Sequence, residues 1–420
     1  MRDVLVFQLA RFGDIVQTKR LLLSLAAEAD VRVHFCVESL LAPVARMLYP
    51  FAQIHELPAH NAGRNAADVV SAARQTFALF REIPFSEVYL LNFSPLSFAC
   101  AALFPPERVR GYARVNGQEM RGRTSQLAFN LLQDRRFAPL NLMDLWAHLH
   151  PRPLSPEQVN PVPKAAGERR IGVVMAGRES RRSLPTPELA ACVRAVFQAR
   201  GGPEIVCLGT QAERPMARRL ARELPSAPAQ KLRDLTGRTS LTDLPEILGG
   251  LDVLLTPDTG TMHLAAHLGV PVQAFFLSSA WCYETGPYGF GHKIWQSVTP
   301  CAPCRESEAC ARNLACLAPF SHPAFLAHLA GTFDAGWPDG LLGCVTMLDR
   351  LGVTCKTVDG DDPYAPARAE LRNGLLSCFG ESSPDVPDPF IRQELAEFLF
   401  TEKDWMLPDN WPVSPFPGRG

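Results

Sequence analysis

The chain has 420 residues, 47% of them hydrophobic, and a formal net charge of −1. The apolar content excludes a wholly disordered protein, the balanced charge gives no electrostatic case for nucleic acid as a partner, and the length suits two or three domains. Met1 leads directly into a strand-like apolar run without the pattern of an export signal, so we expect a cytoplasmic protein.

The first part of the chain alternates short apolar strands with helices. Strands are predicted over residues 3–10, 31–37, 52–57 and 87–92, and helices over residues 15–27, 40–48 and 66–83. This alternation is typical of a doubly wound α/β domain, in which ligands bind beyond the carboxyl ends of the strands. Asp14 follows the first strand, in the turn formed by residues 11–14, and is therefore predicted to lie at such a site.

A proline-rich linker divides the chain. Residues 111–151 are predicted to be mainly helical, and five prolines follow between residues 151 and 163. A second α/β series is then predicted, with strands over residues 170–175, 204–208, 251–255 and 270–276 and helices over residues 186–198, 213–224, 241–248 and 322–329. We expect an N-terminal domain over residues 1–160, a second domain over 161–330, and an extension of unknown role over 331–420. In that extension a helix and a strand are predicted within residues 341–353, and a further helix over 389–400.

The stretch TPDTGTMHLAAHLG, residues 256–269, links a buried strand to a helix in the second domain. An acid, a hydroxyl and a glycine, Asp258, Thr259 and Gly260, stand at the turn, and His263 follows one helical turn later. The first turn of a helix offers free N–H groups and the positive end of the dipole, and a glycine lets phosphate oxygens approach the backbone. The sequence therefore indicates an anion site, with a simple helix cap by Asp258 or Thr259 as the alternative.

Twelve cysteines in a protein expected to be cytoplasmic need an explanation other than the disulfides of secreted proteins. Four of them follow the pattern C-x2-C-x5-C-x5-C, at Cys301, Cys304, Cys310 and Cys316. The first pair has the spacing of metal ligands, and a closed four-thiolate site would hold a structural zinc or iron ion. Reduced thiols in a metal-free loop are the alternative.

Six segments occur in an order that resembles a known family: VLVFQLARFGDIVQT (4–18), RGY (110–112), DLTGRTSL (234–241), DTGTMHLAAHLG (258–269), TGPYG (285–289) and the region of CAPC (301–304). Together they resemble the family 9 glycosyltransferases, the heptosyltransferases of lipopolysaccharide assembly. The resemblance covers roughly residues 1–330. It implies a GT-B fold, in which two Rossmann-like doubly wound domains face a cleft. It also implies an inverting transfer from a nucleotide-activated sugar, typically ADP-heptose, without a catalytic metal.

The resemblance also implies roles for individual residues. Asp14 matches the aspartate taken as general base, which removes the proton of the acceptor hydroxyl; a helix cap is the alternative. Thr259, Gly260 and His263 match the positions that hold the donor diphosphate, and Asp258 would orient the loop or bind a sugar hydroxyl. Arg182 fills a cationic position that is often lysine in the family, with Arg178 and Arg181 as nearby rivals in the same loop.

We therefore expect transfer of a heptose or related sugar from a nucleotide-diphosphate sugar to a lipopolysaccharide-type glycan. The alternatives are a heptosyltransferase that modifies protein, of the autotransporter type, and a non-catalytic nucleotide-sugar-binding protein. The expected partners are the nucleotide-sugar donor and a glycan or glycolipid acceptor. Residues 111–149 are the candidate acceptor surface, and peripheral contact with the inner face of the membrane is a further expectation.

Overall fold

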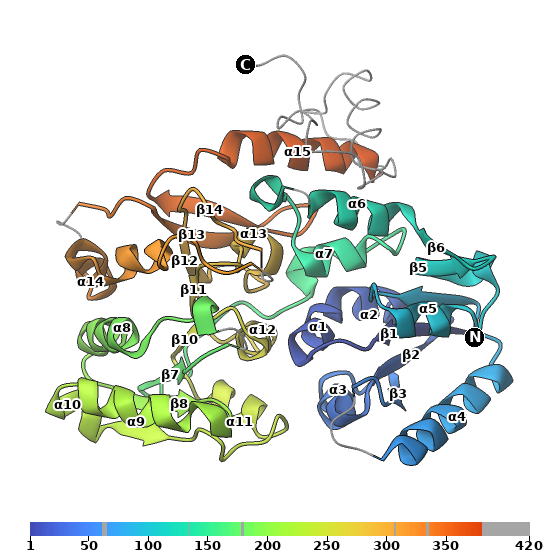
Figure 1. The fold of residues 1–420 in the computed structure, drawn as a ribbon, viewed down its shortest axis with the longest axis horizontal. Helices are drawn as coiled ribbons and strands as arrows, with labels where there is room; N and C mark the ends of the chain where they lie inside the picture. The colour runs from blue at the N-terminus through green and yellow to red at the C-terminus, as the bar shows by residue number, and fades with distance from the viewer. Residues whose placement is uncertain (61–64, 133, 178–179, 306–307, 333–335, 380–420) are drawn as a thin grey trace.

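The computed structural model describes residues 1–420 except 61–64, 133, 178–179, 306–307, 333–335 and 380–420. The helix predicted over residues 389–400 lies outside the described residues. Two α/β domains stand side by side (Figure 1). No helix in the described ranges combines the length and the apolar character that crossing a bilayer requires.

The first domain is built on a six-stranded sheet in the order β3-β2-β1-β4-β5-β6. Its strands are β1 (Arg2–Gln8), β2 (Val31–Glu38), β3 (Gln53–Leu57), β4 (Glu87–Leu90), β5 (Val109–Val115) and β6 (Gln118–Arg121). Its helices are α1 (Phe12–Gln17), α2 (Lys19–Ala26), α3 (Ala42–Leu48), α4 (Ala66–Glu82), α5 (Pro95–Ala101), α6 (Arg123–Leu131) and α7 (Leu142–Ala147). Strand β1 pairs in parallel with β2 and β4, and its Val4, Leu5, Val6 and Phe7 are fully buried, as expected when helices cover both faces of a sheet.

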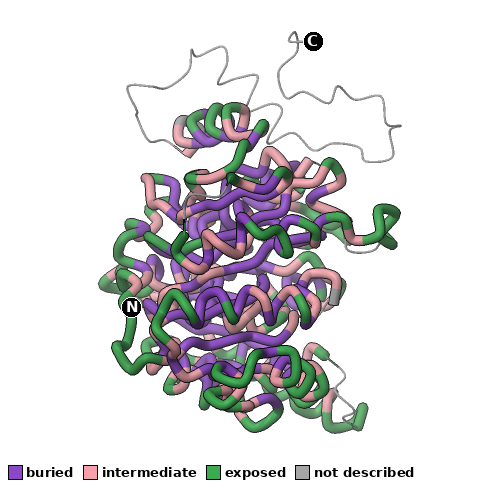
Figure 2. Tube along the Cα trace, turned by 90° about the vertical axis from the view of Figure 1, so that its left-hand side faces the viewer, coloured by how far each residue is buried: buried purple, intermediate pink, exposed green. Residues whose placement is uncertain are grey.

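The second domain is built on an eight-stranded sheet in the order β14-β13-β12-β11-β10-β7-β8-β9. Its strands are β7 (Arg170–Val174), β8 (Glu204–Leu208), β9 (Leu232–Asp234), β10 (Val253–Pro257), β11 (Val272–Phe276), β12 (Lys293–Ser297), β13 (Leu341–Leu348) and β14 (Val353–Asp359). The helices after the linker are α8 (Thr186–Ala199), α9 (Arg214–Glu223), α10 (Ser226–Gln230), α11 (Leu244–Gly249), α12 (Gly260–His267), α13 (Cys282–Thr285), α14 (Pro323–Leu329) and α15 (Ala365–Cys378). Figure 2 shows buried segments through the interior of the molecule and exposed segments on the outside. The two doubly wound sheets confirm the predicted fold class.

Two predictions of local structure are wrong. The predicted helical region after residue 111 begins instead with the antiparallel hairpin of β5 and β6, whose turn at Asn116 and Gly117 has positive φ values of 50° and 83°. Asn-Gly is a strong signal for such a turn, so the sequence did contain the information. The helix predicted within residues 341–353 is absent: strand β13 pairs antiparallel with both β12 and β14.

Residues 341–378, within the region predicted as an extension, take part in both domains. Strands β13 and β14 widen the second sheet, and α15 then crosses to the first domain, where Leu371 and Leu375 pack in the core that contains Leu22 and Trp146 (Figure 1). A buried polar cluster supports this crossing. Asp144 accepts hydrogen bonds from Arg20 at 2.6 Å, from the Tyr288 hydroxyl at 2.6 Å and from the Val353 N–H at 2.8 Å.

Candidate functional site

The first predicted turn lies between β1 and α1. Arg11 is extended, with φ −101° and ψ 171°, and α1 begins at Phe12, so that Asp14 lies inside the first helical turn and not before the helix. One carboxylate oxygen of Asp14 accepts the N–H of Arg11 at 3.0 Å, so Asp14 takes part in a capping box with Arg11 and is not itself the cap of a helix that begins at residue 15. Burial raises the pKa of Asp14; the N–H and guanidinium of Arg11 oppose this, and the charge of Asp258 adds to it.

The second turn follows β10 and begins α12. Thr259 is the cap of this helix: its backbone is extended and its hydroxyl accepts the N–H of Met262 at 3.3 Å. Asp258 has a different role, because its carboxylate forms an ion pair with Arg182 and accepts the hydroxyl of Thr285 at 2.9 Å. The sequence left open which of the two residues caps the helix, and the structure assigns the cap to Thr259.

The two turns are in contact, although they are about 245 residues apart in the chain. A Cβ atom placed on Gly260 would lie 2.6 Å from the Phe12 ring and 3.1 Å from the Gly13 nitrogen. A Cβ atom on Gly13 would lie 3.3 Å from the His263 ring and 3.4 Å from the Gly260 Cα. Two glycines therefore allow the first turns of α1 and α12 to meet, and the structure places Asp14 close to the predicted donor residues.

Arg182 is the arginine of its loop that reaches the second turn. It lies in a short 3₁₀ turn, Ser180–Arg182, and its ion pair with Asp258 is only partly exposed. The guanidinium of Arg181 points elsewhere and donates to the carbonyl of Arg305 at 2.7 Å. Arg178 lies outside the described residues. The geometry thus favours Arg182 over Arg181 as the cation of the site.

His263 faces the same turn but as a neutral group. Its side chain is buried, and its Nε2 lies 3.7 Å from a carboxylate oxygen of Asp258. Burial lowers the pKa of His263 to about 4, with a further lowering by Arg182, although Asp258 acts in the opposite direction. Near neutral pH the imidazole is therefore a hydrogen-bonding group, and Arg182 is the cation beside Asp258.

Three residues that sequence reasoning missed complete the surroundings of Asp258. Thr285 binds it directly, and Glu284, the preceding residue, pairs with Arg135 of the first domain at 2.9 Å. The TGPYG segment was noted only as part of the family resemblance, and nothing in the local sequence pairs residue 284 with residue 135. A fourth residue, Lys19, also joins the domains, because its ammonium group donates to the carbonyl of His267 in α12 at 3.4 Å.

The cysteine segment lies next to this region. Burial and the neighbouring Cys301 thiol raise the pKa of Cys304, and Cys316 is buried. Cys310 is exposed, and its sulfur accepts the N–H of Leu314 at 3.3 Å. Across the described ranges, which omit residues 306–307 of this segment, no three His, Cys, Asp or Glu side chains gather in an arrangement that could hold a metal. The predicted metal site at the four cysteines stays a prediction.

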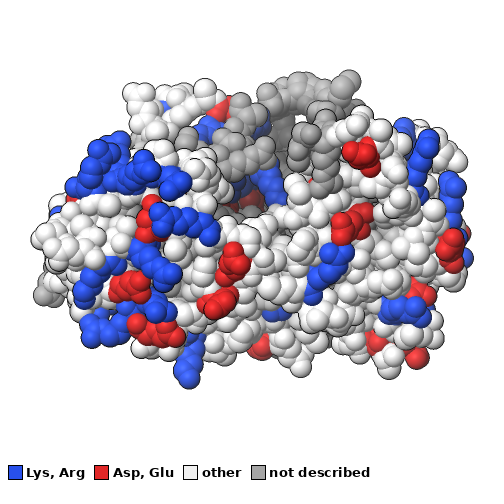
Figure 3. Space-filling model, turned by 90° about the horizontal axis from the view of Figure 1, so that it is seen from below, with Lys and Arg blue, Asp and Glu red and all other residues white. Residues whose placement is uncertain are grey.

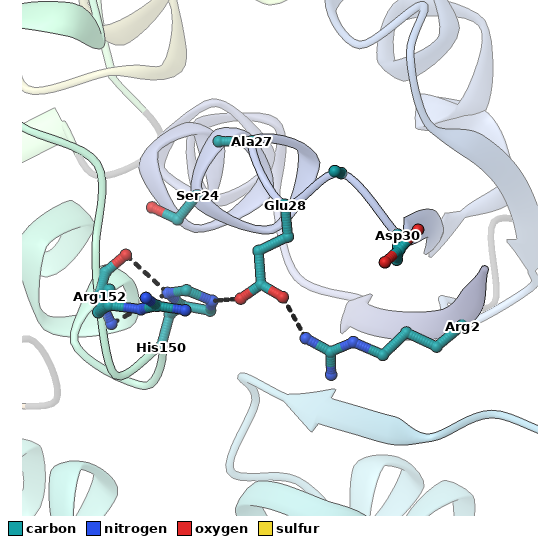
Figure 4. A pocket seen from close by; sticks show the side chains of 8 residues that line it. Arg2, Ser24, Ala27, Glu28, Asp30, His150 and Arg152 are labelled. Carbon is teal, nitrogen blue, oxygen red and sulfur yellow. Dashed lines mark hydrogen bonds and ion pairs between the residues drawn. The ribbon is translucent and has the colours of Figure 1, made fainter.

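A separate pocket lies at the opposite end of the first sheet, beside the start of β1 (Figure 4). Its polar groups bind one another: Glu28 pairs with Arg2 and accepts from His150 at 2.7 Å, and the other nitrogen of His150 lies 2.8 Å from the Arg152 carbonyl. Ligands of doubly wound sheets bind at the carboxyl ends of the strands. The two turns, which lie at those ends of the strands, therefore stay the candidate site, and this pocket does not.

The arrangement at the two turns is suited to transfer of a group from a diphosphate. A carboxylate with a raised pKa stands on one domain, and a helix N-terminus with a paired arginine stands on the other. The carboxylate can accept a proton, and the helix dipole and arginine can stabilise a departing anion.

Comparisons with known proteins show what the chain is similar to. Residues 189–315 match the model of glycosyltransferase family 9 (heptosyltransferase). Lipopolysaccharide heptosyltransferase 1 of Pseudomonas aeruginosa is 38% identical over 96 residues, which are 23% of this chain and 25% of that protein. The match to this curated relative therefore spans about a quarter of its length.

Solved structures of the family share the fold. The family 9 glycosyltransferase of Veillonella parvula superposes with a TM-score of 0.55 at 16% identity, covering 71% of this chain and 88% of that one. The E. coli heptosyltransferase WaaC with ADP superposes with a TM-score of 0.51 at 18% identity, covering 68% and 91%. The GT-B-like fold is thus confirmed, and over residues 189–315 the chain is similar to glycosyltransferase family 9, as the sequence resemblance indicated.

Proposed function

We propose that the protein is an inverting glycosyltransferase that moves a heptose or related sugar from a nucleotide-diphosphate donor, ADP-heptose above all, to a lipopolysaccharide-type glycan. The observation that carries the proposal is the contact between the turn of Asp14 and the turn of Gly260 and His263. The family match and the printed names of the relatives support the choice of donor.

In the proposed reaction, an acceptor hydroxyl attacks the anomeric carbon while the bond from that carbon to the diphosphate breaks. Asp14 takes the hydroxyl proton, for which its raised pKa is favourable near neutral pH. The N–H groups at the start of α12 and the guanidinium of Arg182 stabilise the charge that develops on the diphosphate. His263 contributes a neutral hydrogen bond, and Asp258 holds Arg182 in place before the donor binds.

Transfer assays test the proposal. Purified protein is incubated with ADP-heptose and either a lipopolysaccharide core acceptor or a polypeptide acceptor, and release of ADP is followed. We expect glycan-dependent release that is lost in Asp14→Asn, while ADP binding is kept. Transfer to polypeptide alone would support the protein-modifying alternative, and binding without any turnover would support a nucleotide-sugar-binding protein.

Contact with the inner face of the membrane remains part of the proposal for a lipid-linked acceptor. Residues 191–240 carry nine Lys and Arg against four Asp and Glu, and Figure 3 shows cationic side chains gathered on the second domain's side of the underside. Arg218, Arg219 and Arg222 of α9, within this range, are exposed. Near an anionic membrane surface, each such group contributes about 1 kcal/mol to the free energy of binding. Sedimentation with anionic but not neutral vesicles, at low but not high salt, is the expected result.

We also propose that a metal at Cys301, Cys304, Cys310 and Cys316 is structural and takes no part in transfer. The proximity of the Cys301 and Cys304 thiols favours it, whereas the contact of Cys310 with Leu314 does not. Zinc or iron bound there would stabilise the loop by linking thiolates.

A further inference from the structure

The one-turn helix α13 lies between a charged residue of the first domain, Arg135, and a charged residue of the second domain, Asp258. Its residue Glu284 faces Arg135 of the first domain, and the next residue, Thr285, donates to Asp258 of the donor turn at 2.9 Å. The first residue of α13, Cys282, is held against β12 by a hydrogen bond from its N–H to the side-chain oxygen of Gln296 at 3.0 Å. One short element thus contacts a first-domain arginine on one side and the predicted donor turn on the other.

The guanidinium of Arg135 donates several hydrogen bonds to this region. Its Nε donates to both carboxylate oxygens of Glu284 at 2.9 Å, and its Nη atoms donate to the carbonyls of Ser279 at 2.9 Å and Cys304 at 3.3 Å. Ser279 and Glu284 follow β11, the second of them in α13, and Cys304 lies in the segment after β12. A planar, multidentate group of this kind fixes the relative positions of its partners, which a lysine could not do.

The carboxylate of Glu284 interacts electrostatically with the charged residues of the predicted donor site. Burial raises the pKa of Glu284, Arg135 opposes this, and the charges of Asp258 and Arg182 also act on it. The ion pairs Arg135–Glu284 and Arg182–Asp258 are therefore near neighbours. Thr285 connects them, because it follows Glu284 in the chain and donates a hydrogen bond to Asp258.

We propose that Arg135 is a positioning residue: through Glu284 and Thr285 it holds Asp258, and hence Arg182 and the donor turn, in the orientation seen here. The effect of Arg135 on catalysis rests on the proposed function, whereas its effect on the order of the donor turn does not. The first domain would in this way complete the donor site of the second domain only when the two domains are docked.

The ordering is tested without any ligand, by hydrogen exchange of peptides that cover residues 256–263. Arg135→Ala should speed exchange in these peptides about tenfold, the effect expected when the one charge-assisted hydrogen bond that reaches the turn, from Thr285 to Asp258, is no longer held in place. Thr285→Val, which breaks the connection without leaving a buried charge, should produce the same change. The double variant should add little to either single variant, because both interrupt one connection.

Arg136→Ala is the matched control. Arg136 lies beside Arg135 in the same 3₁₀ turn, but it pairs with Asp134 at 2.7 Å and does not reach the donor turn. Exchange in residues 256–263 should stay at the wild-type rate in this variant. The proposal is overturned if Arg135→Ala leaves the turn unchanged, if it speeds exchange throughout the protein to the same degree, or if the two single effects add in full.

Binding of ADP gives the functional side of the test. If wild-type protein binds ADP, Arg135→Ala should weaken the Kd about tenfold, with a smaller loss in Arg135→Lys and none in Arg136→Ala. Failure of the wild-type protein to bind ADP would count against the proposed donor, while the exchange measurement would still decide the role of Arg135.

Discussion

Gly260→Ala is expected to push the two turns apart. The added Cβ atom would lie 2.6 Å from the Phe12 ring and 3.1 Å from the Gly13 nitrogen. The ring can turn to some extent, but the backbone nitrogen belongs to the first turn of α1 and moves only with that helix. The substitution therefore acts on the contact between the domains and leaves the fold of each domain intact.

The free-energy cost of Gly260→Ala follows from those distances. Adding a methyl group where packing is already tight destabilises a protein by about 1–3 kcal/mol. If the whole cost falls on the docked arrangement of the two turns, its population relative to an undocked one decreases by roughly 5-fold to 150-fold, since 1.4 kcal/mol is a factor of ten. We expect kcat/KM to fall within this range and the melting temperature to fall by a few degrees.

Gly249→Ala is the control, because a Cβ atom on that helical glycine meets nothing within 4 Å. A second comparison uses Phe12→Ala, in which the nearest obstacle is removed, so that Gly260→Ala should cost distinctly less in that background than in the wild type. Turnover and thermal unfolding of all four variants are measured together. The reasoning fails if Gly260→Ala behaves like Gly249→Ala in both assays.

Four further expectations concern the base, its pH dependence, the buried cluster and the cysteines. Asp14→Asn should lower kcat by about 10²-fold to 10⁴-fold, the usual contribution of a general base, and a kcat close to the wild-type value would exclude that role. Because the base acts when deprotonated and the pKa of Asp14 is raised, kcat/KM should fall as the pH decreases through a value above that of an ordinary aspartate; the acidic limb should be missing from the residual activity of Asp14→Asn. Asp144→Ala leaves Arg20 buried without its carboxylate and should cost about 3–5 kcal/mol in denaturant unfolding; a loss below about 1 kcal/mol would contradict the assigned ion pair. Elemental analysis of protein purified without added metal should give zinc or iron near one ion per chain, and a negligible content would exclude the cysteine site.

The local sequence was enough to locate both turns of the site. Apolar strands followed by Gly13–Asp14 and by Asp258–Gly260 carry their own signals, because glycines and capping residues mark the ends of strands and the starts of helices. The order of strands and helices was also enough to predict two doubly wound domains. These features depend on spacing along the chain, which is visible without knowledge of the fold.

Choices between neighbouring residues needed the structure. Whether Asp258 or Thr259 caps α12, and whether Arg181 or Arg182 reaches the turn, depends on side-chain directions that similar local sequences do not distinguish. The charge state of His263 depends on its burial between two domains. The role of residues 341–378 depended on pairing with β12 and on packing against the first domain, both of which involve partners far away in the sequence.

The sequence by itself determined the two-domain α/β plan and pointed to the resemblance to family 9 and to the candidate base and donor turn, because these features depend on short motifs and their order. Only the tertiary structure decided that Gly13 and Gly260 touch, and that Arg135 reaches Glu284 across 149 positions of the chain. The physical reason is that such contacts are fixed by the docking of two domains, where burial and charge pairing are shared by residues that no local pattern connects.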